Sequence, residues 1–257
     1  MGLLQRILAH PLTRGLDIDD PRTTALRRRI IQEKPFLRRI YEEWYGLLRD
    51  ALPWGSQPAL ELGSGAGFAK EAIPNLITSE IFATPGVDLV LDGQQLPLPP
   101  GSLRGIVMSD VLHHLPQVRR FFAEAARCVR PGGAVAMIEP WVTPWSSLIY
   151  TRLHHEPFVP EAAEWHFPAS GPLSAANGAL PWIIFQRDRQ SFERQFPQLR
   201  VERIQPLMPL RYLLSGGVSM RGLMPGVTFG LWRYLEAMLL STGADLAMFA
   251  LIVLRRN

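Results

Sequence analysis

Between residues 58 and 140 the sequence alternates short apolar runs with helical or loop segments, and this alternation constrains the fold more than any other feature. The runs are bounded by glycine, proline or polar residues, which is typical of buried strands. The segment "QVRRFFAEAARCV" repeats apolar residues at intervals of three and four, which indicates a helix face packed on a sheet. This order predicts a parallel sheet with crossover connections. The predicted strands of the segment cover 58–62, 76–83, 87–92, 103–110 and 134–140.

The flanking regions add helices before the sheet and two strands after it. Residues 1–52 are predicted to be helical, and Pro35 is expected to divide this region into two helices. We predict a helix at 189–196 and strands at 199–207 and 246–256. Hydrophobic residues make up 47% of the 257 residues and charged residues 19%, which fits a folded chain with one core.

The cysteine count and the N-terminal residues indicate a protein of a reducing compartment. Cys128 is the only cysteine, so we expect neither an internal disulfide nor a cysteine metal site. The first residues, "MGLLQRILAH", lack the features of a secretory signal. The longest apolar run, "LAMFALIVL", is shorter than the ~20 residues that a membrane-spanning helix needs. We therefore expect a cytoplasmic protein that contacts a membrane at most peripherally.

The stretch "ALELGSGAGF" has glycines at every second position behind an apolar run, and it raises the question of a phosphate site. A dinucleotide-binding fingerprint requires glycine at the position of Phe68. A P-loop requires glycine before, and serine or threonine after, the position of Lys70. Both patterns fail, so the turn is not predicted to hold a phosphate, and a nicotinamide dehydrogenase is excluded.

The same turn suits a ligand that carries a carboxylate and an amine. A short helix expected at 68–73 would present N–H groups that favour a carboxylate. Glu61, just before the turn, suits an amine. S-adenosylmethionine has both groups at its methionine end. Taken alone, however, the turn is equally typical of a tight joint between a strand and a helix.

Further motifs decide between these interpretations. With "LVLDGQQLPLPPGSL", "IVMSDVLHHL" and "AARCVRPGGAVAMIEP", the turn closely resembles the class I S-adenosylmethionine-dependent methyltransferases, especially the type 11 group. The resemblance covers residues 58–140. It implies an α/β, Rossmann-like fold: seven mostly parallel strands, the last one antiparallel, with helices on both faces. From the resemblance together with the sequence pattern of the flanking regions, we predict an N-terminal helical cap at 1–52 and a methyltransferase domain at 53–257, with insertions at about 141–185 and 207–245.

The resemblance implies S-adenosylmethionine as cofactor and assigns its contacts residue by residue. Asp92 in "VLDGQQLP" would hydrogen-bond the adenine amine, and Gly93 would offer its backbone. Ser109 and Asp110 end a strand at the sheet edge where ligands of such folds collect. The predicted cofactor residues are Glu61, Gly63, Ser64, Gly65, Gly67, Glu80, Asp92, Gly93, Ser109 and Asp110.

The acid that binds the ribose is ambiguous, because the spacing from Gly67 to Asp92 is too short for the usual helix between the second and third strands. Glu80, in "LITSEI", is our first candidate, and Asp88 is the second. We prefer Glu80 because Asp88 would stand near the start of the third strand, away from the ligand edge.

Catalysis of methyl transfer needs mainly alignment of donor and acceptor, and a base only where the acceptor loses a proton early. His113 and His114 follow the fourth strand, where the family lines its pocket. Either histidine is a candidate catalytic base, and packing against the cofactor is the alternative.

A second group of polar residues lies in "RLHHEPF", which follows the fifth strand. His154, His155 and Glu156 are consecutive there, but adjacent residues on a helix or strand point apart, so we expect no metal site. We predict instead that an acceptor-facing loop includes Trp141, His154, His155 and Trp165. The alternative is that the aromatic residues form a lid and core.

The sequence indicates the class of methyl acceptor mainly by excluding one class, nucleic acid. The Pro-Pro-Tyr motif of nucleic-acid amine methyltransferases is absent, Cys128 lies on a buried face, and the net charge is only +4, so nucleic acid is not expected. We predict O-methylation of a small-molecule, glycan or lipid-linked acceptor. Residues 208–240 mix apolar side chains with arginines and could form a lid, a homodimer contact or a peripheral membrane contact. The alternative function is a methyltransferase-like binding or regulatory protein without turnover.

Overall fold

A computed structural model describes residues 10–13, 19–65, 67–154, 156–168, 171 and 174–257. Its strands form one seven-stranded sheet in the order β3-β2-β1-β4-β5-β7-β6. β7 is antiparallel to β5 and β6, and the remaining neighbours pair in parallel. This confirms the predicted Rossmann-like, mostly parallel sheet with an antiparallel last strand. The strands are β1 (Ala59–Leu62), β2 (Leu76–Glu80), β3 (Leu89–Val90), β4 (Leu103–Ser109), β5 (Val129–Pro140), β6 (Leu199–Leu207) and β7 (Phe249–Arg256).

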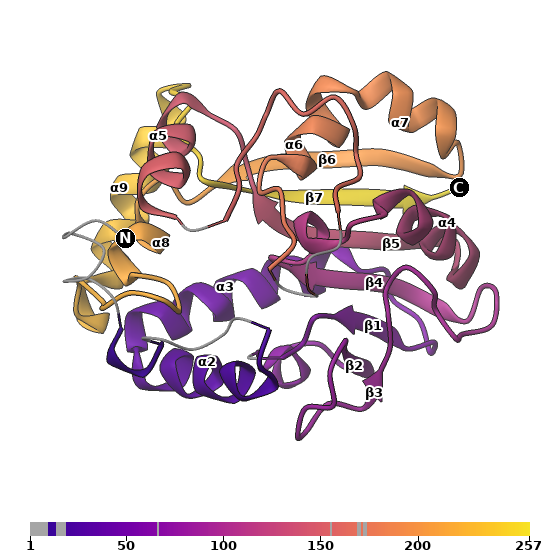
Figure 1. Cartoon of the computed structure of the whole chain (residues 1–257), viewed down its shortest axis with the longest axis horizontal. Coiled ribbons are helices and arrows are strands. Elements are labelled where there is room, and N and C mark those ends of the chain that lie inside the picture. The colour runs from indigo at the N-terminus through magenta and orange to yellow at the C-terminus, as the bar shows by residue number, and fades with distance from the viewer. Residues whose placement is uncertain (1–9, 14–18, 66, 155, 169–170, 172–173) are drawn as a thin grey trace.

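Helices cover the sheet and gather at one end of it (Figure 1). α3 packs on β4, β5 and β7, whereas α4 and α6 contact β5 and α7 contacts β6. α5, α8 and α9 lie together at the end of the molecule opposite the C-terminus. The α-helices are α2 (Pro21–Glu33), α3 (Pro35–Ala51), α4 (Val118–Cys128), α5 (Pro144–Leu153), α6 (Leu180–Trp182), α7 (Arg189–Gln195), α8 (Arg211–Ser215) and α9 (Phe229–Ser241). The other helical turns are η1 (Pro11–Thr13), η2 (Ala69–Glu71), η3 (Leu112–His114), η4 (Ile183–Arg187) and η5 (Gly226–Thr228).

The N-terminal helices form as the sequence predicts. Lys34 has an extended backbone, with φ −108° and ψ 91°, and Pro35 begins the next helix, so the proline divides the region into α2 and α3. α3 buries Phe36, Ile40, Trp44 and others of its apolar face in the core. The boundary between a helical cap at 1–52 and a domain at 53–257 stays a prediction, and residues 1–9 and 14–18 lie outside the described part.

Three elements differ from the sequence-based expectation. The helix expected at 68–73 is only the three-residue 3-10 turn η2. The strand expected at 87–92 is reduced to the exposed pair Leu89–Val90, because this strand is the edge of the sheet and pairs with β2 alone. β5 begins at Val129, directly after α4, and pairs with Leu103 before a bulge. The absence of a long helix after the glycine turn weakens the argument that a helix terminus attracts the ligand's carboxylate.

The C-terminal insertion folds onto α3 through a buried arginine. Arg211 at the start of α8 pairs with Glu236 of α9, and its NH groups donate to Glu43 of α3 at 2.7 and 2.9 Å. Within 208–240, Leu231, Tyr234 and Met238 of α9 remain exposed. A homodimer contact or a peripheral membrane contact there stays a prediction. None of the described helices is both long and apolar enough to cross a membrane.

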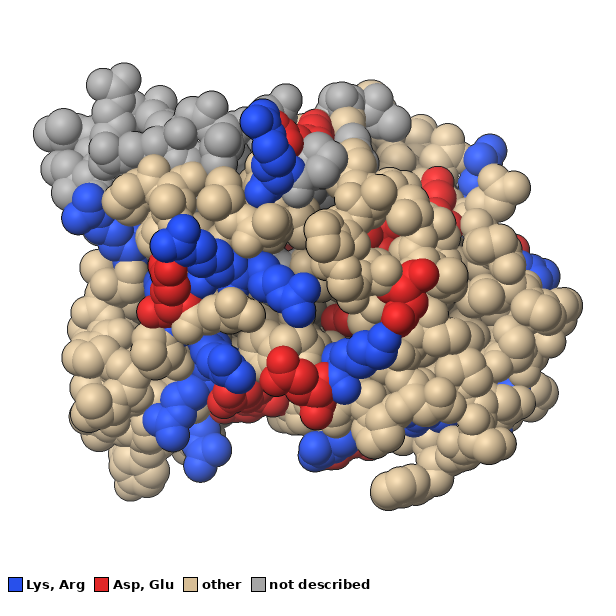
Figure 2. Space-filling model, turned by 90° about the horizontal axis from the view of Figure 1, so that it is seen from below, with Lys and Arg blue, Asp and Glu red and all other residues tan. Residues whose placement is uncertain are grey.

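Charges on the outer face of α2 and α3 are interleaved (Figure 2). Arg29 pairs with Glu33 at 2.6 Å, and Arg38 pairs with Glu42 at 3.1 Å. These exposed pairs leave a mixed surface on this face rather than one continuous basic patch, and the expectation that nucleic acid is not the substrate stays a prediction.

Candidate cofactor and acceptor site

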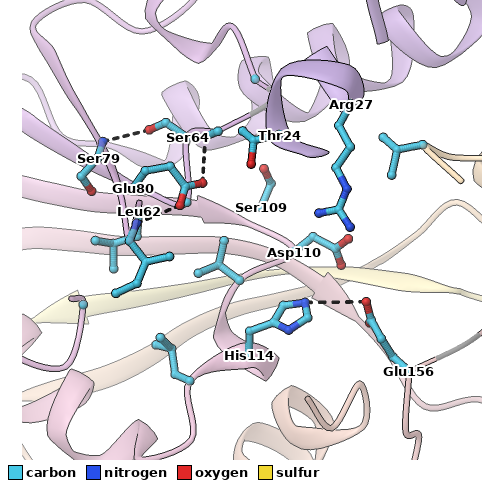
Figure 3. A pocket seen from close by; sticks show the side chains of 18 of the residues that line it. Thr24, Arg27, Leu62, Ser64, Ser79, Glu80, Ser109, Asp110, His114 and Glu156 are labelled. Atoms are coloured by element: carbon cyan, nitrogen blue, oxygen red, sulfur yellow. Dashed lines mark hydrogen bonds and ion pairs between the residues drawn. The ribbon is translucent and has the colours of Figure 1, made fainter. Parts of the chain in front are cut away.

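A cavity of about 510 Å³ opens where the glycine turn, the ends of β2, β3 and β4 and the N-terminal helices meet. One end is lined by the turn itself, by Glu80 and by Asp92. The other end is lined by Asp110, His114 and residues of the two insertions. Figure 3 shows Glu80 and Ser64 at the first end and Asp110, His114 and Glu156 at the second. The single cavity therefore joins the predicted cofactor residues to a separate polar region.

The glycines of the turn are required because other groups approach its backbone closely. A Cβ atom at Gly67 would lie 2.2 Å from the hydroxyl oxygen of Tyr45, and one at Gly65 would lie 2.5 Å from Oε1 of Glu80. Gly63 has φ +66°, a left-handed conformation that favours glycine. The turn therefore has no room for side chains at Gly65 and Gly67, and it lies directly against Tyr45 and Glu80, which line the cavity with it.

Glu80 and Asp88, the two candidates for the ribose acid, have different surroundings. Glu80 ends β2, lines the cavity and accepts from the backbone N–H groups of Gly65 at 3.1 Å and Ile81 at 2.8 Å. Asp88 is not among the lining residues and instead pairs with Lys70 at 2.6 Å and accepts from Thr78. The Lys70 hydrogen bond lowers the pKa of Asp88 to about 2. These contacts favour Glu80 as the ribose acid.

Glu61 lies beneath the turn, and its side chain is not among those that line the cavity. It is only 3% exposed, and burial raises its pKa from 4.5 to about 7. The carboxylate is therefore costly to ionise unless a positive group such as the ligand's amine comes near it. Direct contact of Glu61 with the amine stays a prediction.

The raised pKa of Glu61 predicts a pH dependence of stability in the ligand-free protein. Because the folded-state pKa exceeds the unfolded value, ionisation opposes folding, and stability falls as pH rises from about 4.5 through 7. At about 1.4 kcal/mol per pKa unit, the rise from 4.5 to about 7 corresponds to a loss of about 3–4 kcal/mol. Glu61→Gln should remove it, so the unfolding free energies of the two proteins, measured in urea at pH 5 and pH 8, should diverge with pH. Parallel pH curves would contradict the assignment.

The remaining predicted cofactor residues are arranged around the same cavity. Asp92 follows β3 and accepts from the backbone N–H of Gln94 at 2.8 Å, which fixes its carboxylate beside the cavity. Ser109 ends β4 and lines the cavity too. Gly63, Ser64, Gly65, Gly67 and Gly93 also belong to the lining.

Asp110 has the most unusual backbone of the lining residues. Its φ of +64° is left-handed, which aspartate tolerates better than most residues. Burial raises the pKa of its carboxyl to about 7. Such a carboxyl can gain or lose a proton near neutral pH.

The two adjacent histidines divide into one that faces the cavity and one behind it. His114 lines the cavity, and burial lowers its pKa to about 3, so it stays neutral. His113 is fully buried. Burial alone would lower the pKa of His113, but hydrogen bonds to Glu139 and Glu156 raise it well above 6.5. The sequence did not separate these two roles.

The predicted acceptor-facing residues are only partly brought together. His154 lines the cavity, as does Glu156, which the sequence analysis considered only as a metal ligand. Trp141 and Trp165 are buried and are not among the lining residues; Trp165 donates to Asp188 at 2.8 Å and lies under Arg119. These two tryptophans thus follow the alternative expectation, that the aromatic residues build the core. His155 lies outside the described residues.

Sequence reasoning missed the aromatic residues that close the cavity. Tyr41 and Tyr45 of α3 and Tyr212 of α8 line it, together with Arg27 of α2. Tyr45 also accepts from the backbone N–H of Phe68 at 3.3 Å and so holds the glycine turn. The tyrosines lie on helices far from the motifs along the sequence, and their helical spacing indicated only a buried face.

Comparison with known proteins gives a family and a set of similar folds. Residues 60–137 match the family model described as a methyltransferase domain. No curated protein matches the chain. Geranyl diphosphate C-methyltransferase from Streptomyces coelicolor A3(2), solved with Mg²⁺, geranyl diphosphate and S-adenosyl-L-homocysteine, has a TM-score of 0.54 at 12% identity, over 97% of this chain and 92% of that one.

Two further structures show a similar fold. A geranyl diphosphate methyltransferase in complex with S-adenosylmethionine has a TM-score of 0.52 at 15% identity, over 97% and 96% of the two chains. A chain of the complex between the Haloferax volcanii Trm112 methyltransferase activator and a methyltransferase has a TM-score of 0.53 at 14% identity, over 93% and 97%. The match of residues 60–137 to a methyltransferase domain and the seven-stranded sheet bear out the predicted resemblance to the class I S-adenosylmethionine-dependent methyltransferases and their fold.

Proposed function

We propose that this protein transfers a methyl group from S-adenosylmethionine to a hydroxyl of a small-molecule, glycan or lipid-linked acceptor. The observation that carries the proposal is the continuity of the cavity, which runs from the glycine turn to a polar end at Asp110, His114 and Glu156. Carboxylates and a neutral imidazole can accept hydrogen bonds from hydroxyl groups, so this end favours a hydroxyl-bearing acceptor over a purely apolar one.

The residues present fit the cofactor. Gly65 and Gly67 line the cavity and can receive the methionine end, Glu80 can accept from the ribose hydroxyls, and Asp92 can accept from the adenine amine. When bound, the cofactor supplies a methyl group already activated on a sulfonium. What remains for the chain is to hold the acceptor, exclude water and receive a proton.

We assign the proton to Asp110. Its carboxylate faces the polar end of the cavity, and burial makes it a stronger base than a solvated aspartate. His114 is the weaker base, because burial disfavours its protonated form. Its neutral ring is better suited to bind and orient a group at this end.

Glu80→Ala is expected to weaken binding of S-adenosylhomocysteine by about 10- to 100-fold, because a charge-assisted hydrogen bond contributes about 1.5–3 kcal/mol. Asp88→Ala, the matched control at the start of β3, should change the dissociation constant less than threefold, since Asp88 pairs with Lys70 and Thr78 instead. Isothermal calorimetry measures both. The opposite order of effects would show that Asp88 is the ribose acid.

Turnover is tested with methyl-labelled S-adenosylmethionine and fractionated extracts of the native cell. We expect the labelled methyl group to appear in an alkali-stable methyl ether that is formed from a hydroxyl-bearing compound. Label on nitrogen or carbon would correct the acceptor atom. Binding of S-adenosylhomocysteine without transfer to any fraction would instead favour a binding or regulatory protein.

A further inference from the structure

Three side chains from two distant segments converge at the polar end of the cavity. Nε2 of His113 lies 3.4 Å from Oε2 of Glu156, and Nε2 of His114 lies 3.8 Å from Oε1 of the same carboxylate. One nitrogen from each histidine and one oxygen from the glutamate all lie within 4.8 Å of one another. Figure 3 shows the facing pair His114 and Glu156.

Contacts on the far side of each ring fix the orientation of both imidazoles. Nδ1 of His113 lies 2.7 Å from Oε2 of Glu139, whose other oxygen accepts from the backbone N–H groups of Val111 and Leu112. Nδ1 of His114 lies 3.1 Å from the carbonyl oxygen of Ala175. A carbonyl or a carboxylate can only accept, so we assign the ring proton to Nδ1 in each histidine. Nε2 of each ring then faces Glu156, and in His113 an ion at this nitrogen would replace the proton that Nε2 donates to Glu156.

This arrangement is typical of histidines that bind a metal. A ligating histidine almost always donates its other ring N–H to a carboxylate or a backbone carbonyl, which sets its tautomer and strengthens it as a ligand. His113 has the first kind of partner and His114 the second. Both partners are held by the sheet or the insertion, so the two rings are positioned before any ion binds.

The adjacent histidines can share one ion because they lie in η3. In this 3-10 turn the two ring centroids are 4.2 Å apart, with an angle of 40° between the planes. The expectation that adjacent residues point apart holds for regular helices and strands. That expectation concerned His154 and His155. It does not hold for His113 and His114, because these two residues lie in a 3-10 turn.

We propose that His113, His114 and Glu156 bind one divalent ion of the zinc class. Two imidazole nitrogens and one carboxylate oxygen suit such an ion, whereas Mg²⁺ and Ca²⁺ prefer ligand sets of oxygen. A tetrahedral ion with bonds of about 2.0–2.1 Å needs ligand atoms about 3.3 Å apart. His113 and His114 contact different oxygens of Glu156, at 3.4 and 3.8 Å, and one atom from each of the three residues lies within 4.8 Å of the others, so the side chains would have to draw closer around an ion.

The fourth position of such an ion would face the cavity. His114 and Glu156 both line it, and Oδ1 of Asp110 lies 4.0 Å from Nε2 of His113. An acceptor hydroxyl on this position would be polarised by the ion and would lie beside the carboxylate of Asp110. This role rests on the proposed methyl transfer, but binding of the ion does not.

Metal titration tests the site without any need for turnover. The full chain is freed of metal with a chelator and titrated with Co²⁺, a spectroscopic substitute for Zn²⁺. We expect one ion per chain with visible absorption bands of nitrogen- and oxygen-bound cobalt. Both Glu156→Gln and His114→Gln should weaken binding at least tenfold, and Glu139→Gln should weaken it by about 10- to 100-fold through the His113 ring.

Two comparisons make the result decisive. His166→Gln, which removes an exposed histidine whose Nδ1 lies 3.7 Å from Glu164, should bind Co²⁺ as the wild type does. Zn²⁺ should raise the melting temperature of the wild type and leave that of Glu156→Gln unchanged. Absence of saturable binding, or equal binding by the wild type, Glu156→Gln and His114→Gln, would show that the cluster is an ion-paired network only. Binding of S-adenosylhomocysteine, measured separately, reports on the proposed function whichever way this test falls.

Discussion

Asp110→Asn is expected to lower the rate of methyl transfer by about 10²- to 10⁴-fold, the range that a positioned general base contributes. Asparagine keeps the size of the side chain and tolerates the left-handed backbone at this position, where φ is +64°. It cannot, however, take a proton from the acceptor. The measurement is kcat/KM with the identified acceptor at saturating S-adenosylmethionine.

The control for this variant is cofactor binding. Affinity for S-adenosylhomocysteine should change less than tenfold, because the amide oxygen of asparagine can replace the carboxylate as a hydrogen-bond acceptor. A variant that transfers methyl groups at the wild-type rate would show that no proton passes to Asp110. Loss of binding together with activity would mean that the residue acts through the cofactor instead.

Gly67→Ala is expected to weaken cofactor binding by about 10- to 100-fold. The added Cβ would lie 2.2 Å from the hydroxyl of Tyr45 and 3.1 Å from the carbonyl oxygen of Ser64, so the turn must open. Tyr45 is 1% exposed and cannot move away easily. Overpacking of this kind costs about 1–3 kcal/mol, and every 1.4 kcal/mol is tenfold in affinity.

Gly46→Ala provides the matched control for the turn variant. Gly46 lies in α3, and a Cβ there meets nothing within 4 Å. Alanine at this position should leave binding unchanged and slightly stabilise the helix. If Gly67→Ala binds S-adenosylhomocysteine as tightly as Gly46→Ala does, then Tyr45 does not limit the shape of the turn.

The central sheet could be predicted from the sequence because its signals are local. The apolar runs before Gly63 and Ser109 and the helical spacing of α4 each report on a buried face. The preference for Glu80 over Asp88 as the ribose acid also came from position along a strand, and it stays a prediction. The length of the edge strand β3 was overestimated, because an apolar sequence carries no information about how many neighbouring strands a strand will pair with.

The polar end of the cavity was only partly predictable, because it is assembled from segments far apart along the chain. Glu156 meets His113 and His114 across a long insertion, and Glu139 supports them from β5. No spacing rule connects these residues. Trp165 was predicted to face the acceptor because it lies in an aromatic stretch of the sequence. In the structure it is buried, with contacts to Asp188 and Arg119.

Calorimetric titration of the full chain with S-adenosylhomocysteine tests most directly whether this cavity is a cofactor site. We predict one molecule bound per chain, with binding weakened in Glu80→Ala and in Gly67→Ala and retained in Asp88→Ala and in Gly46→Ala. A folded protein that binds no S-adenosylhomocysteine, or one whose affinity is the same in all four variants, would contradict the assignment of the cavity.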